Sequence, residues 1–264
     1  MGAAEDWEAY LYPVEETQGP GRVLRNNFEE KSLAGLMIYE RSATALRQRQ
    51  LSQGVVKIPQ TFDAEHVRRI HGHLFQDVYP WAGQFRNVDI SKRGQPFAAV
   101  EDMGAYLDVA TEFARGARWG DMTHEEFARS ISVVFAYTNT AHPFREGTGR
   151  TTKQLLRDVA ALSPYRLDFD DVDKTTWNAM ARASMPAPGG DGHPQLEEAI
   201  PLFRTITVRR EAMPAQVDEY AQIQDLVRVA FDNTKFRAAL GGVTRPEEAS
   251  PTLQRDQGKG YGRS

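Results

Sequence analysis

The chain has 264 residues, of which 41% are hydrophobic and 26% charged, and its net charge is −4. This composition is typical of a globular protein with one large domain, and the acidic balance argues against nucleic acid or an anionic membrane as a partner of the whole molecule. The absence of cysteine excludes disulfides, thiolate zinc sites and cysteine nucleophiles. No window approaches 18 consecutive apolar residues, and the acidic start lacks the features of a signal peptide. We expect no membrane span and a cytoplasmic location, or translocation into a host cell by a dedicated secretion system.

Most of the chain carries apolar residues at helical spacing. Helices are predicted around these ranges, in chain order: 33–51, 63–75, 103–113, 125–138, 151–162, 177–184 and 223–230. The first of them is only weakly amphipathic. The fourth has a clear start signal, because Thr123 is followed three residues later by Glu126, which is the spacing of a capping box.

One segment breaks the helical pattern. Residues 85–98 alternate briefly around a Lys92-Arg93-Gly94 turn, which predicts a small β-hairpin. The fold class is therefore mainly α with one hairpin. We expect the domain organisation to be a lead-in over 1–30, the main helical domain over 31–212, a C-terminal helix over 213–240 and a disordered tail over 241–264.

The segment that carries chemistry is His-Pro-Phe-Arg-Glu-Gly-Thr-Gly-Arg at 142–150, between two predicted helices. A Gly-x-Gly turn that leads into a helix presents free backbone N–H groups at the positive end of the helix dipole, where a phosphate can approach closely. Arg150 adds a cation that can grip phosphate oxygens. Glu146 offers a hard oxygen ligand for Mg²⁺, and His142 can take a proton from a hydroxyl.

Each of these features also has an ordinary explanation when it is taken alone. A Gly-Thr-Gly before a helix is usually a turn, His-Pro is usually a helix end, and Glu146 alone would be a solvated carboxylate. A base, a metal ligand, an anion cradle and an arginine within one short loop together favour a site of nucleotide-phosphate transfer.

The loop resembles the signature HxFx[D/E]GN[G/K]RxxR of the Fic family. The likeness extends over about residues 10–210, including YLYP and VLRN in the lead-in and the stretch 74–98 that ends in the hairpin. The resemblance implies a helical Fic domain with a β-hairpin flap. It also implies a protein adenylyltransferase, which uses ATP and Mg²⁺ to place AMP on a hydroxyl side chain of a target protein.

Roles follow from the resemblance position by position. His142 resembles the catalytic base, Phe144 the buried anchor of the loop, and Glu146 the Mg²⁺ ligand. The implied nucleotide-binding residues are Gly147, Thr148, Gly149, Arg150 and Lys153. The flap is expected to dock the target protein through backbone pairing, with Asp89, Ile90, Ser91, Lys92, Gln95, Pro96 and Phe97.

Two positions depart from the family pattern. Thr148 stands where the family usually has asparagine, and Lys153 stands where it has a second arginine. Gly149 matches the form of the signature that favours AMP transfer over the phosphorylation typical of the Doc branch. Two alternatives stay open: transfer of UMP or a phosphoryl group on the same scaffold, and a degenerate Fic module that acts by binding.

Family members are commonly inhibited by a glutamate in an [S/T]xxxE[G/N] helix. Glu40 does not fit that pattern, because Leu36 precedes it and Arg41 follows it. The glutamates that follow the domain, Glu211, Glu219, Glu247 and Glu248, fail the pattern as well. We therefore expect any inhibition to come in trans from a small antitoxin.

Elsewhere, we expect Asn139 to brace the loop and Trp81 to be structural. We expect no metal site among His66, His71 and His73, because their spacing does not place all three on one helix face.

Overall fold

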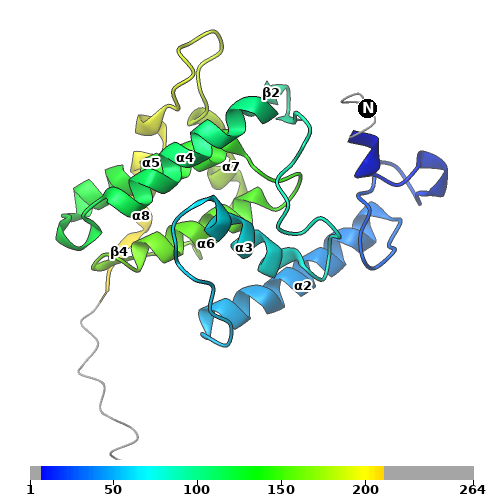
Figure 1. The fold of residues 1–264 in the computed structure, drawn as a ribbon, viewed down its shortest axis with the longest axis horizontal. Coiled ribbons are helices and arrows are strands. Elements are labelled where there is room, and N and C mark those ends of the chain that lie inside the picture. Colours follow the sequence, from blue (N-terminus) through cyan, green and yellow to red (C-terminus); the bar gives the residue numbers. More distant parts are fainter. Residues whose placement is uncertain (1–6, 211–264) are drawn as a thin grey trace, which may run out of the picture. The chain divides into compact units, whose positions relative to one another are not determined.

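The structure is a computed structural model that describes residues 7–210 (Figure 1). The helix predicted over 213–240 and the tail predicted over 241–264 lie outside the described residues. Among residues 7–210, no helix is both long and apolar enough to cross a membrane.

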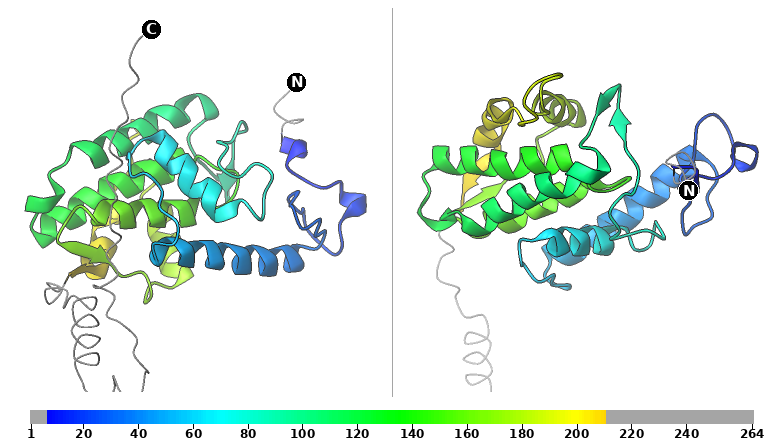
Figure 2. Two further views of the ribbon diagram at one scale, coloured as in Figure 1. Left: turned by 60° about the horizontal axis from the view of Figure 1, so that its bottom comes forward. Right: turned by 45° about the horizontal axis from the view of Figure 1, so that its top comes forward.

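Helices make up most of the described chain, and every helix predicted within it is present. Their bounds are α2 Leu33–Ser52, α3 Ala64–Phe75, α4 Val100–Gly116, α5 His124–Ala141, α6 Thr148–Ala160, α7 Lys174–Ala183 and α8 Ile200–Ile206. Short 3-10 turns lie at η1 Val14–Glu16, η2 Trp119–Asp121 and η3 Leu196–Glu198. Helix α5 packs against α4, α6 and α8, and α3 joins α2 to α6 (Figures 1 and 2).

The central position of α5 follows from its sequence. The predicted capping box forms: Glu126 N donates to Thr123 Oγ1 at 3.3 Å, and Thr123 N donates to Glu126 Oε2 at 2.8 Å. Apolar side chains of α5 such as Phe127, Ile131 and Val134 are fully buried. A capped helix enclosed in this way gives the loop that follows it a rigid start.

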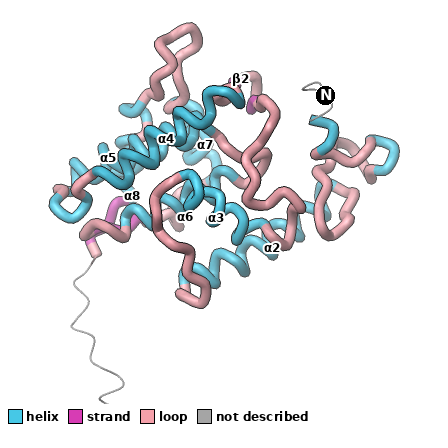
Figure 3. Tube along the Cα trace, viewed as in Figure 1, coloured by secondary structure: helices cyan, strands magenta, loops and turns pink. Residues whose placement is uncertain are grey.

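The predicted hairpin forms within the long connection between α3 and α4 (Figure 3). Strand β1 Ser91–Lys92 pairs antiparallel with β2 Gln95–Pro96, with Lys92 opposite Gln95. Arg93 and Gly94 between them both have positive φ, at 53° and 80°. Two such residues are the signature of the tight turn that matches the twist of a hairpin.

A second strand pair, which is not a hairpin, was not predicted from the sequence. Strands β3 Tyr165–Leu167 and β4 Thr207–Arg209 pair antiparallel and connect the end of α6 to the end of α8. Each strand has only three residues, which is too short for an alternating pattern to stand out in the sequence.

The lead-in before α2 lies against the same body. Tyr12 N donates to Val23 O at 2.9 Å, and Asn27 N donates to Val78 O at 2.8 Å. The ring of Tyr10 meets that of Trp81 edge-on, with centroids 5.6 Å apart.

Candidate active site

The predicted functional loop runs from the end of α5 to the start of α6. Its first residue, His142, caps α5 with a left-handed backbone, φ 40° and ψ 62°, and its N–H donates to Thr138 O at 3.0 Å. A non-glycine residue in this conformation is strained, and such strain gathers at functional sites. The side chain of Asn139 bonds to the backbone of α7. Its amide donates to Ala181 O at 2.7 Å and thereby ties α5 to the end of α7.

The imidazole of His142 is covered by the flap. The ring of Phe97 stacks on it, with centroids 3.7 Å apart and planes 21° apart. Burial, with smaller contributions from the charges of Lys92 and Arg86, lowers the pKa of His142 to about 3. The ring is therefore neutral at physiological pH, which is the form that accepts a proton.

The middle of the loop is anchored by Phe144 and by a histidine that the sequence did not single out for this role. Phe144 is fully buried and stacks on the ring of His71, with centroids 3.8 Å apart. His71, also fully buried, donates from Nε2 to Glu146 O at 3.0 Å and accepts at Nδ1 from Gly83 N at 2.8 Å. Burial lowers the pKa of His71 to about 4, so it is a neutral brace for the loop backbone.

The anion cradle predicted from the two glycines lies at the start of α6. Gly147 is the N-cap with φ 88°, and no side chain caps the helix. Glu146 Oε1 accepts from Gly147 N at 2.9 Å. The Thr148 hydroxyl is buried and exchanges hydrogen bonds at 3.3 Å with the N–H and C=O of Phe144. Thr148 thus closes the loop with its side chain, and the uncapped first turn offers backbone N–H groups.

The two predicted cations of α6 have different surroundings. Arg150 is half-exposed and forms an ion pair with Glu40 of α2. Lys153 instead lies over two aromatic rings, with Nζ 4.4 Å from the centroid of Trp177 and 5.2 Å from that of Phe169. Burial, and secondarily the charge of Arg157, lowers the pKa of Lys153. Within residues 7–210, no carboxylate forms an ion pair with Lys153.

Arg86 connects the flap to the loop and was also missed at the sequence level. Its guanidinium is buried and donates to four backbone carbonyls, those of His142 at 2.9 Å, Val88 at 2.8 Å, Ala141 at 3.2 Å and Ala98. The carbonyls of Val88 and Ala98 flank the hairpin, and the other two end α5. One side chain therefore fixes the flap relative to His142.

The predicted flap residues divide into outward and inward groups. Ser91, Lys92 and Pro96 are exposed, whereas Ile90, Gln95 and Phe97 are partly covered. Asp89 accepts from Val100 N at 2.8 Å and so supports the start of α4. Lys92 Nζ donates to Asn178 Oδ1 of α7 at 3.2 Å, which brings the hairpin beside α7 (Figure 2).

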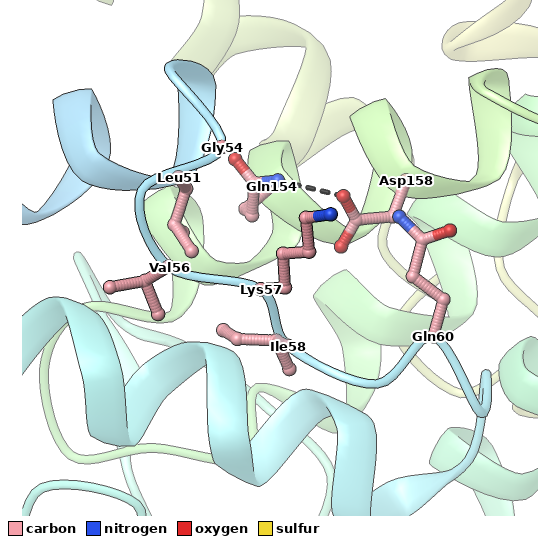
Figure 4. A pocket seen from close by; sticks show the side chains of 8 residues that line it. All are labelled: Leu51, Gly54, Val56, Lys57, Ile58, Gln60, Gln154 and Asp158. Atoms are coloured by element: carbon pink, nitrogen blue, oxygen red, sulfur yellow. Dashed lines mark hydrogen bonds between the residues drawn. The ribbon is translucent and has the colours of Figure 1, made fainter. Parts of the chain in front are cut away.

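The cavity in Figure 4 does not coincide with this loop. Its volume is about 410 Å³, and it lies between the end of α2, the connection to α3 and the second half of α6. Apolar side chains of Leu51, Val56 and Ile58 line it together with Lys57, Gln154 and Asp158, and the last two are hydrogen-bonded at 2.8 Å. None of the predicted site residues lines this cavity.

Comparison with known proteins gives the loop its context. A family model described as the Fic/DOC family matches residues 61–158. The protein adenylyltransferase VbhT of Bartonella schoenbuchensis is 34% identical over 138 residues, which are 52% of this chain and 28% of VbhT. The probable protein adenylyltransferase Fic of Salmonella typhimurium is 30% identical over 176 residues, which are 66% of this chain and 82% of that protein. The chain belongs to the Fic/DOC family.

Solved structures share the Fic fold. The effector BepC of Bartonella tribocorum, with bound AMPPNP, superposes with a TM-score of 0.63 at 22% identity, over 77% of this chain and 98% of BepC. The N-terminal Fic domain of an effector from Bartonella sp. AR 15-3 gives a TM-score of 0.66 at 20% identity, over 76% of this chain and 91% of that domain. The predicted fold, a mainly α Fic domain with a hairpin, is thereby confirmed.

Proposed function

We propose that this chain is a protein adenylyltransferase that moves AMP from ATP to a hydroxyl side chain of another protein. The arrangement of the loop from His142 to Arg150 carries the proposal. Within one loop, it brings together the neutral imidazole of His142, the half-exposed carboxylate of Glu146, the uncapped start of α6 and the guanidinium of Arg150. Relatives named protein adenylyltransferases share this family. The match spans only 28% of VbhT, so the proposal concerns the Fic domain.

The residues of the loop divide the reaction between them. Backbone N–H groups of α6 and the Arg150 guanidinium bind the phosphates of ATP. The target hydroxyl attacks the α-phosphorus while its proton passes to the His142 imidazole. The bond from that phosphorus to the bridging oxygen then breaks, and pyrophosphate leaves. Positioning and charge neutralisation supply the catalysis, as in phosphoryl transfer generally.

Glu146 fits the proposed Mg²⁺. Its side chain is 46% exposed, and one oxygen is held by Gly147 N while the carboxylate stays open to solvent. Mg²⁺ usually binds through one or two carboxylates together with substrate phosphates. An ion held by Glu146 would neutralise charge on the phosphates of ATP.

The flap is proposed to dock the target protein. In an antiparallel ladder, hydrogen-bonded and non-hydrogen-bonded residue pairs alternate. Phe97 N donates to Ile90 O at 3.1 Å, so the next pair, Ser91 with Pro96, is a non-hydrogen-bonded one. The Ser91 N–H therefore points away from the hairpin. An extended target segment can accept from this donor by β-augmentation.

Labelled nucleotides test the reaction. The purified protein is incubated with cell lysate and ATP labelled at the α- or the γ-phosphate, or UTP labelled at the α-phosphate. A protein band labelled only by α-labelled ATP is the expected result. A band labelled by γ-labelled ATP indicates phosphoryl transfer, and one labelled by UTP indicates UMP transfer.

Two variants test the assigned roles. His142→Ala should abolish labelling while ATP-analogue binding and the unfolding temperature stay close to those of the wild type. Glu146→Ala should remove the Mg²⁺-dependent part of the activity. A wild-type protein that binds the analogue but labels nothing in any lysate would favour the degenerate binding module.

We also propose that inhibition comes from a small antitoxin in trans, consistent with an Lys153 that forms no ion pair within residues 7–210. On this proposal the purified chain is active by itself. Activity that appears only after removal of a terminal segment would overturn it. We further propose that the protein acts either in the cytoplasm of the producing cell or in a host cell after translocation. BepC is described as a translocated effector. Fractionation of the producing and recipient cells distinguishes the two.

A further inference from the structure

Arg150 is held by contacts that come from outside its own loop. Its Nη1 donates to Thr44 Oγ1 at 3.0 Å, and its Nη2 forms an ion pair with Glu40 Oε1. Its guanidinium carbon lies 4.6 Å above the centroid of the Phe75 ring. Both polar partners lie on α2, one helical turn apart, more than 100 residues before Arg150 in the sequence.

Glu40 is itself fixed from its other side. The Tyr79 hydroxyl donates to Glu40 Oε2, so each carboxylate oxygen has one donor. The Glu40 side chain is only 16% exposed, and Tyr79 is buried. Burial, and then the charge of Glu40, raises the pKa of Tyr79, so this hydroxyl keeps its proton and remains a donor.

The contacts leave part of the guanidinium free toward the loop. A guanidinium has five N–H donors, and α2 engages one on each terminal nitrogen. Nη2 also lies 3.7 Å from Glu146 Oε1, so the same nitrogen faces the proposed metal ligand. The anchored side chain therefore presents its remaining donors beside the uncapped start of α6.

We propose that Glu40 is a positioning residue that orders Arg150 for binding the distal phosphates of ATP, an inference that rests on the proposed function. Fixing a long side chain in advance removes an entropy cost that the nucleotide would otherwise meet on binding. Glu40 also brings negative charge near the phosphates, which opposes their binding. The Glu40 carboxylate is held by Tyr79 as well as by Arg150, so it belongs to a fixed network. We therefore expect the gain in nucleotide affinity from ordering Arg150 to exceed the loss from the negative charge of Glu40.

Three variants separate ordering from charge. Glu40→Ala removes the anchor and the charge together. Thr44→Val removes one anchor of Arg150 with no change in charge and little change in shape. Asp77→Ala is the matched control, because Asp77 pairs with Arg47 of α2 at 2.6 Å and does not contact Arg150.

Calorimetry with a non-hydrolysable ATP analogue and with AMP gives the readout. Loss of ordering for one long side chain corresponds to about a two- to tenfold rise in Kd. We expect Glu40→Ala and Thr44→Val to raise the Kd of the analogue by such a factor and to leave the Kd of AMP unchanged, since AMP lacks the distal phosphates. Asp77→Ala should leave the ratio of the two affinities unchanged even if it lowers thermal stability.

The outcomes distinguish the inference from the function on which it rests. If wild type binds the analogue and Glu40→Ala binds it as tightly or more tightly, Glu40 is a competitor of the phosphates or a bystander, and the inference is wrong. If Glu40→Ala does not fold, Thr44→Val decides alone, and an unchanged affinity ratio overturns the inference. If wild type binds no analogue at all, the proposed function fails, and the inference fails with it.

Discussion

Replacing Gly147 by alanine tests whether the anion loop has the geometry described. A Cβ at this position would lie 2.3 Å from Phe75 Cζ and 2.4 Å from Phe75 Cε2, and the backbone there has φ 88°. Phe75 cannot move aside easily, because it is fully buried and its ring stacks on His71 with centroids 4.6 Å apart.

Two costs add at this position. A left-handed backbone at a residue with a Cβ costs about 1–2 kcal/mol, and overpacking in a well-filled core costs about 1–3 kcal/mol. We therefore expect Gly147→Ala to lower the free energy of unfolding by about 2–5 kcal/mol. ATP-analogue binding should weaken as well, because the displaced Phe75 ring lies under Arg150.

Gly149 is the matched control two residues away. It has no positive φ, and nothing lies within 4 Å of a Cβ built on it. Gly149→Ala should therefore leave stability unchanged or raise it by up to about 1 kcal/mol through helix propensity. Urea unfolding monitored by circular dichroism measures both variants, with the m-value checked for constancy.

A double-mutant cycle isolates the clash. Phe75→Leu in the Gly147→Ala background should recover part of the loss, with a coupling energy of at least about 1 kcal/mol. A Gly147→Ala variant within about 0.5 kcal/mol of wild type would refute the reasoning, because surface changes alone produce effects of that size.

Three further predictions concern the flap, Arg86 and His71. Ser91→Pro should lower kcat/KM for the target protein at unchanged thermal stability, because it removes the outward N–H of the flap. Ser91→Ala keeps that N–H and should leave both quantities unchanged. Equal kcat/KM in the two variants would contradict flap docking. Arg86→Lys should cost about 2–4 kcal/mol in urea unfolding, because one ammonium cannot reach four buried carbonyls. The pKa of about 4 for buried His71 lies below the unfolded value of 6.5, so the unfolded chain binds more protons between these pH values. The contribution of neutral His71 to the free energy of unfolding is then fully present above pH 6.5. It falls by up to about 1.4 kcal/mol per pH unit toward pH 4. His71→Gln should reduce this slope in urea unfolding measured across the same pH range.

The elements that could be predicted from the sequence are those whose signal is local. Helix α5 carries its capping box and its apolar stripe within a single window, and both formed as predicted. The functional loop could be placed because His142, Glu146 and Arg150 are neighbours in the chain, so the two helices that flank it fix their separation. The hairpin turn was marked by Arg93-Gly94.

The contacts that were missed join residues far apart in the sequence. His71 meets the loop across 75 residues, and Arg86 reaches His142 across 56. Helix α2 was predicted, but nothing in its sequence indicated that it faces the functional loop. It buries Thr44 and mostly buries Glu40, while it exposes Met37 and Ile38, so its inward face is partly polar and its apolar pattern is weak. Pattern reasoning assumes an apolar inward face, and a helix that serves a charged site violates that assumption.

The Fic loop therefore depends on two sets of supports with different positions in the chain. His71, Phe75 and Arg86 hold its backbone and its anchor, and all three lie within residues 61–158 matched by the family model. Glu40 and Thr44, which hold Arg150, precede that range. A fragment limited to the matched residues would keep the braces of the loop but lose the tether of its arginine. The shape of the proposed anion cradle is thus a property of the matched domain, whereas the position of Arg150 depends on α2.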